Sequence, residues 1–135
     1  MEVLKILSKQ GVRDIFLNYL AFNTHGKNEL SSWIMKANSF NIKIHIRIQV
    51  FYKGMWINPE DTDINSLVEE AKKYASKQGV TWVLFDYLRY PGTAHQYYHA
   101  TEKINLFIKL AMAGIHSINS KCIVSASLMP ETTRG

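Results

Sequence analysis

The chain has 135 residues, which is the length of one domain with its own hydrophobic core. Hydrophobic residues make up 47% and charged residues 20%, a composition that excludes an intrinsically disordered chain. The net charge of +5 is spread along the chain without a basic run, so it predicts mild attraction to anionic polymers and no nucleic-acid site.

The predicted elements alternate between helices and strands in chain order. Apolar side chains recur at helical spacing over residues 3–10, 28–40, 64–78 and 101–118. Strands are expected at residues 12–20, 42–52, 80–90 and 122–129, which are rich in β-branched and aromatic residues. Asn28 and Thr101 are the expected caps of the second and fourth helices, and Asp61 and Asp63 suit the start of the third.

A short run occurs twice, 68 residues apart, as Ser8–Val12 and Ser76–Val80. Each copy reads as a helix end, a Gly cap and the start of a buried strand, and the strands end at Asn18 and Asp86. The match arises either from internal duplication or from the local preferences of any helix-to-strand junction. In both cases the two strand ends are predicted to be structurally equivalent.

The strand spacing predicts an α/β fold of parallel βα repeat units, with residues 1–135 forming a single domain. Two architectures fit: a small open sheet, or half of a TIM-type (β/α)8 barrel whose remainder is absent. Residues 42–50 alternate between apolar and polar side chains, which favours the barrel because its strands have one face toward helices and one toward the interior. An edge strand of an open sheet would alternate in the same way.

The sequence shows no evident membrane span, signal peptide, reactive cysteine, metal site or cofactor motif. No apolar run reaches the roughly 18 residues of a membrane span, and Glu2, Lys5 and Lys9 make the N-terminus unlike a signal peptide. Cys122 lies in an apolar run and is expected to be a buried small side chain. We expect no metal, because His95 and His99 have no evident third ligand, and no cofactor, because the glycines form no phosphate loop.

Asp86 is the strongest catalytic candidate. It shares side-chain parity with Trp82 and Leu84, and a carboxylate at the end of a buried strand needs partners or a cavity. Arg89 is near enough to pair with it, so the alternative is an Asp–Arg pair that only fixes the loop. Glu131 follows the last strand and makes a second candidate for paired acid and base chemistry, unless it is an exposed loop residue.

Further polar and aromatic side chains are expected at the same strand ends, where they would contact a substrate. Aromatic rings there can stack on sugar rings, although ordinary loop packing is the alternative. The candidate substrate-binding residues are Asn18, His45, Arg47, Gln49, Tyr52, Trp56, Arg89 and Tyr90.

The run Phe85–Pro91 resembles the strand motif of glycoside-hydrolase-like (β/α)8 barrels, in which a hydrophobic strand ends in Asp-Tyr-hydrophobic-Arg-aromatic-Pro. The longer string, through residues 92–94 and on to Ser125–Glu131, is similar to domains of methanogen surface proteins, some of which carry pseudomurein-binding repeats. The resemblance covers about a third of the chain. It implies an extracellular or cell-surface location, a polysaccharide or cell-wall glycan partner, and Asp86 as the carboxylate of a barrel strand.

The sequence therefore predicts a glycoside hydrolase that acts on cell-wall or surface polysaccharide by carboxylate chemistry. The alternative is a non-catalytic carbohydrate-binding or wall-associated module, and a weaker option is a small α/β regulatory domain with an open sheet. Four strands are visible where a barrel has eight, so the chain is expected to be a fragment of a longer barrel or to self-associate through its exposed sheet edges.

Overall fold

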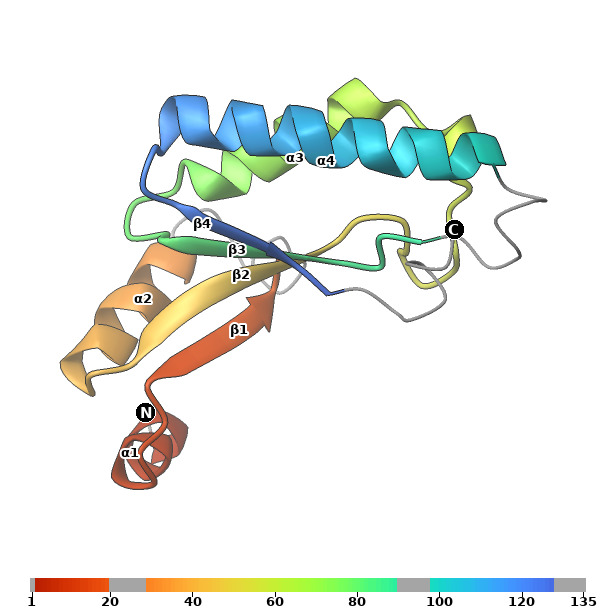
Figure 1. Cartoon of the computed structure of the whole chain (residues 1–135). Helices are drawn as coiled ribbons and strands as arrows, with labels where there is room; N and C mark the ends of the chain where they lie inside the picture. The colour runs from red at the N-terminus through yellow and green to blue at the C-terminus, as the bar shows by residue number, and fades with distance from the viewer. Residues whose placement is uncertain (1, 20–28, 90–97, 128–135) are drawn as a thin grey trace.

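The computed structural model describes residues 2–19, 29–89 and 98–127, which form helices and parallel strands in alternation (Figure 1). In chain order the elements are α1 (Glu2–Lys9), β1 (Asp14–Asn18), α2 (Glu29–Ser39), β2 (Lys43–Gln49), the short 3-10 helix η2 (Pro59–Asp61), α3 (Ile64–Ala75), β3 (Trp82–Asp86), α4 (Tyr98–Ile118) and β4 (Ile123–Ala126).

The strands of the described residues form one sheet in the order β1-β2-β3-β4. All three pairings are parallel, with Asn18 beside Arg47, Gln49 beside Asp86, and Leu84 beside Ser125. The prediction of an α/β fold built from parallel βα units is thus confirmed. β2 lies inside the sheet, paired on both sides, so the alternating pattern of residues 42–50 does not come from an edge strand.

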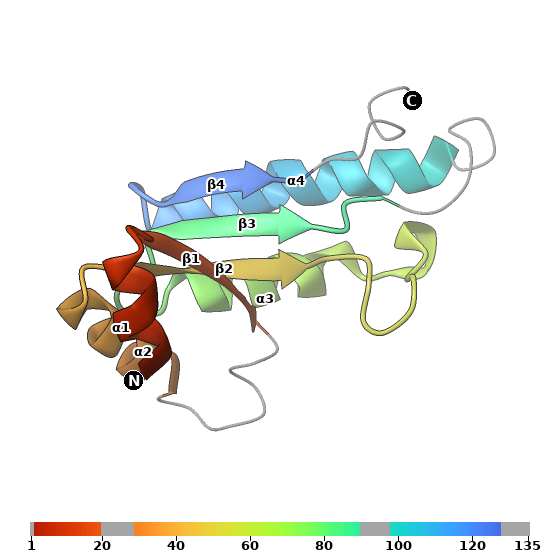
Figure 2. The same cartoon turned by 90° about the horizontal axis from the view of Figure 1, so that it is seen from below.

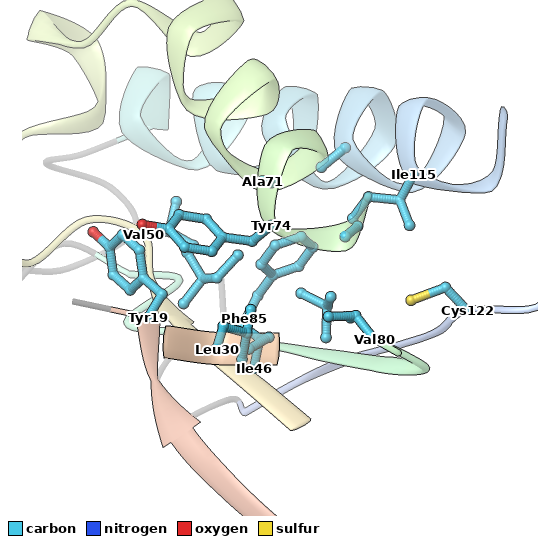
Figure 3. Close-up of a cluster of buried hydrophobic side chains, with 14 of the residues drawn as sticks. Tyr19, Leu30, Ile46, Val50, Ala71, Tyr74, Val80, Phe85, Ile115 and Cys122 are labelled. Carbon is cyan, nitrogen blue, oxygen red and sulfur yellow. The ribbon is translucent and has the colours of Figure 1, made fainter. Parts of the chain in front are cut away.

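Helices α3 and α4 cover one face of the sheet (Figure 1). Ile44, Ile46 and Ile48 of β2 and Val83 and Phe85 of β3 point into a hydrophobic cluster that also contains buried residues of α2, α3 and α4. Figure 3 shows Ala71 of α3 and Ile115 of α4 above Phe85 and Val80 in this cluster. Burial of these apolar side chains stabilises the fold. It also means that the residues alternating with them along each strand lie on the opposite face of the sheet.

The two copies of the repeated run adopt the same local structure. Gly11 and Gly79 have φ angles of 85° and 89°, the left-handed conformation that ends helices and that glycine adopts without steric cost. The strands that follow begin at Asp14 and Trp82 and end at Asn18 and Asp86, each pair 68 residues apart. The predicted equivalence of these two junctions is confirmed.

Element boundaries differ from the predictions in two respects. All four strands begin later than the apolar runs that predicted them, at Asp14, Lys43, Trp82 and Ile123. Thr101 is not a cap: α4 begins at Tyr98, which puts Thr101 inside the helix. Asp63 does cap α3, where it accepts hydrogen bonds from the backbone N–H groups of Asn65 and Ser66, whereas Asn28 lies outside the described residues.

Candidate functional site

The face of the sheet opposite α3 and α4 carries most of the predicted site residues. Figure 2 looks toward this face, with the strands in front of α3 and α4. Strand alternation places Arg47 and Gln49 of β2 and Asp86 of β3 on it, because their neighbours Ile46, Ile48 and Phe85 point into the core. We call it the open face and define it by the residues that alternate with the core residues along β1 to β4.

Arg47 and Asp86 form an ion pair across β2 and β3. The Asp86 Oδ2 atom accepts hydrogen bonds from Arg47 Nε at 2.8 Å and from Arg47 Nη2 at 2.7 Å. The Asp86 Oδ1 atom accepts a hydrogen bond of 2.8 Å from the backbone N–H of Tyr87. Both carboxylate oxygens therefore accept hydrogen bonds, which fix the orientation of the group. The pairing of Asp86 with an arginine is as expected, but the arginine comes from the neighbouring strand.

Three aromatic rings lie beside this ion pair, and we call Tyr52, Trp56 and Tyr87 the aromatic cluster. Tyr52 stacks on Tyr87 with ring centroids 4.5 Å apart, and Trp56 meets both rings edge-on at 5.4–5.5 Å. The Arg47 guanidinium carbon lies 5.9 Å from the centre of the Tyr87 ring, and that of Arg89 lies 5.7 Å from the centre of Trp56. The cluster thus joins two cationic side chains to exposed or half-buried aromatic surface.

The backbone at Tyr87 explains how the ring reaches this cluster. Tyr87 has a φ angle of 57°, a left-handed conformation that is uncommon for a residue with a bulky side chain. It ends β3 and turns the ring toward Tyr52, whereas the equivalent Tyr19 after β1 is buried against Tyr74. Such backbone strain recurs at functional sites, because it persists only where surrounding contacts hold it.

His45 lies on the open face nearer the N-terminal end of β2 than Arg47 does. Its side chain is 2% exposed, its Nε2 atom is 2.8 Å from Asp14 Oδ1, and its ring sits 5.0–5.1 Å from those of Phe16 and Trp82. The Trp82 Nε1–H donates to Ser125 Oγ at 2.9 Å. Phe16, His45 and Trp82 thus form a group of packed rings on the open face. The buried His45 side chain is not accessible to a substrate in this arrangement.

Two buried titratable groups take no part in this site. Burial, with the nearby Glu70 carboxylate, raises the pKa of Tyr19 far above its usual value. Burial also raises the pKa of the Cys122 thiol, which supports the prediction that this cysteine is a packed side chain. Within residues 2–19, 29–89 and 98–127 no group of three or more His, Cys, Asp or Glu side chains is arranged to hold a metal ion.

The structure brings several of the predicted site residues together. Arg47, Asp86, Tyr52, Trp56 and Arg89 are linked by the contacts above. Asn18 and Gln49 lie on the open face as the register neighbours of Arg47 and Asp86. Glu131 and Tyr90, the second predicted carboxylate and the last aromatic candidate, lie outside the described residues.

Sequence reasoning missed two aromatic residues that the structure places at or beside the open face, Tyr87 and Phe16. Tyr87 directly follows Asp86 in the motif, but no pattern in the sequence signals its left-handed backbone. Phe16 shares parity with Asn18, and that parity is the signal that could have placed its ring beside His45 and Trp82.

Comparison with known proteins adds no relative: the chain matches no protein-family model, no curated protein and no solved structure. In the part of the chain that the structure describes, no helix is both long enough and apolar enough to cross a membrane.

Proposed function

We propose that this chain is half of a TIM-type (β/α)8 barrel of the glycoside-hydrolase-like kind and that it acts on cell-wall or surface polysaccharide outside the cell. Three features support the barrel: consecutive strands are neighbours, the helices cover one face, and polar side chains gather at the carboxyl ends of β2 and β3 on the other. The carboxyl ends of barrel strands are where such folds carry their active sites.

One observation carries the functional part of the proposal: the oriented Asp86 carboxylate lies beside an exposed aromatic cluster. Aromatic rings bind the apolar faces of sugar rings, and a fixed negative charge stabilises the positive charge that develops at the sugar carbon during glycosidic cleavage. The resemblance of the Phe85–Pro91 motif to glycoside-hydrolase-like barrels points in the same direction.

The contacts of Asp86 narrow its role. The Arg47 guanidinium donates two hydrogen bonds to Oδ2, whereas Oδ1 accepts one from the Tyr87 N–H and keeps a second lone pair for a substrate atom. We assign Asp86, next to the Arg47 guanidinium, the role of nucleophile or of stabiliser of the transition state. Glu131 is the proton donor in this proposal.

The second candidate function is non-catalytic glycan binding. The engagement of Asp86 by Arg47 and Tyr87 favours it, because the same contacts also describe a structural pair that only shapes the aromatic cluster. Trp56, Tyr52 and Arg89 would then bind the glycan without bond cleavage.

The test compares hydrolysis and binding in the same variants. Release of reducing ends from pseudomurein and from a neutral β-glucan is measured for the wild-type chain, Asp86→Asn and Glu131→Gln, with binding to the same polymers followed in parallel. Asp61→Asn, an exposed carboxylate on η2, is the matched control. The enzyme proposal predicts that both site variants lose hydrolysis by about 100-fold or more while binding and the control stay near wild type. Wild-type binding with no hydrolysis would reject the enzyme in favour of the binding module.

A further inference from the structure

Both edges of the sheet are unpaired within the described residues, since β1 and β4 each have one neighbouring strand. The backbone N–H groups of Ile123 and Ser127 donate to Thr81 and Phe85 on the β3 side. Alternation along the strand then directs the N–H groups of Val124 and Ala126 outward. Within the residues that the structure describes, no strand pairs with the outer side of β4 or of β1. Such edges are templates for further strand pairing.

Between these two edges the open face carries apolar side chains near the N-terminal ends of the strands. Phe16, Trp82 and Leu84 are half-buried, and the side chain of Ile123 is 51% exposed. Covering these side chains would remove aromatic and aliphatic surface from water, which is the main driving force of association.

The charges on the strands of the open face balance, which permits an identical surface to cover it. Its charged strand residues are Asp14, Lys43, Arg47 and Asp86, which are two acids and two bases. Arg47 is ion-paired with Asp86, and Asp14, whose carboxylate contacts His45, is the register neighbour of Lys43. The whole chain carries +5. A surface that is neutral within so basic a chain can meet an identical surface without like-charge repulsion.

We propose that a second copy of this chain covers the open face and completes the sheet. A two-fold axis along the strand direction places β4 of each copy beside β1 of its partner, and every new pairing is parallel, as are those already present. The eight strands then close without an edge, and the aromatic clusters of both copies lie around one mouth. The inference rests on the half-barrel part of the proposed function.

The test is the mass of the chain in solution, measured by light scattering or sedimentation at micromolar concentration without any glycan. Two copies of the 15.5 kDa chain are expected. Ile123→Lys puts a charge on the open face, and Ala126→Pro removes an outward donor while leaving the bonds from Ile123 and Ser127 to β3 intact. Each is expected to weaken the dimer about tenfold or more, as loss of a central interface contact does.

Met35→Lys on α2 is the matched control, because Met35 is exposed on a helix and not on the open face. It is expected to leave the dimer unchanged. Circular dichroism identifies any variant that fails to fold, and the other open-face variant then carries the test. A monomer of 15.5 kDa, an assembly larger than two copies, or a dimer that survives both open-face variants would overturn the inference. Because the mass is read without glycan, such a result leaves the hydrolysis and binding tests unaffected.

Discussion

Arg47 and Asp86 lie 39 residues apart in the chain and meet through the pairing of two strands. Each side chain is less than one-third exposed, so neither charge is fully hydrated once its partner is removed. The pair is therefore expected to contribute to folding as well as to the site, since an uncompensated charge in a partly buried position is costly.

A double-mutant cycle measures this contribution. The free energy of unfolding of Arg47→Gln, Asp86→Asn and the double variant, from urea titrations, is expected to give a coupling of about 1–2 kcal/mol. The coupling should fall at high salt because the pair keeps some contact with solvent. A coupling near zero would show that the two side chains are energetically independent despite their contact.

The same pair shows what the sequence could and could not predict about the site. Strand parity correctly placed Arg47 and Asp86 on the face opposite the core, because alternation is a local property. The partner of Asp86 was expected to be Arg89, three residues away, since sequence distance was the only available measure of proximity. The register that brings Arg47 to Asp86 depends on how β2 and β3 align, and no local pattern encodes that alignment.

Among the elements, the helix ends preceding β1 and β3 offer a matched comparison. Gly11 and Gly79 occupy equivalent positions with left-handed backbones, but their surroundings differ. A Cβ atom at Gly79 would lie 2.9 Å from Ile34 Cγ2, whereas at Gly11 nothing lies within 4 Å.

Alanine at these two glycines is expected to have unequal effects. Gly11→Ala should destabilise the chain by about 1 kcal/mol through backbone strain alone. Gly79→Ala should cost about 2–3 kcal/mol, because the new methyl group also displaces Ile34 of α2. Urea unfolding of both variants gives the comparison. Equal losses would mean that α2 does not pack against the turn before β3 as described.

The cap of α3 predicts a dependence of stability on pH. Hydrogen bonds from the Ser66 hydroxyl and backbone, followed by that from the Asn65 N–H, lower the pKa of Asp63 below its usual value of 3.8. A lowered folded-state pKa stabilises the native state above the unfolded value, and this stabilisation is lost as pH falls through the folded pKa. Carboxylates titrate between about pH 5 and pH 3. Over this range the wild type should therefore lose more stability than Asp63→Asn, as measured by the urea midpoints of unfolding. Parallel pH profiles would contradict the role of this cap.

The fold as a whole was more predictable than its boundaries. Helix-to-strand alternation, the parallel sheet and the equivalent Gly11 and Gly79 junctions follow from local periodicity and turn chemistry, and all are present. Asn18 and Asp86 end β1 and β3 as predicted, whereas the strand starts were placed too early because the apolar runs begin before the residues that pair. Tyr19 and Tyr87 show the limit most clearly: they stand at equivalent positions, yet one is buried in the core and the other joins the aromatic cluster.

At the scale of the whole molecule, we propose that glycan binds at the aromatic cluster beside Asp86. Affinity electrophoresis in gels containing pseudomurein or a neutral β-glucan compares the wild type with Trp56→Ala and with Met55→Ala, a neighbouring exposed side chain outside the cluster. We predict that Trp56→Ala weakens binding to a retarding polymer about tenfold, as expected for the loss of one aromatic contact, and that Met55→Ala binds like the wild type. Absence of retardation for the wild type, or equal retardation of all three chains, would contradict the claim.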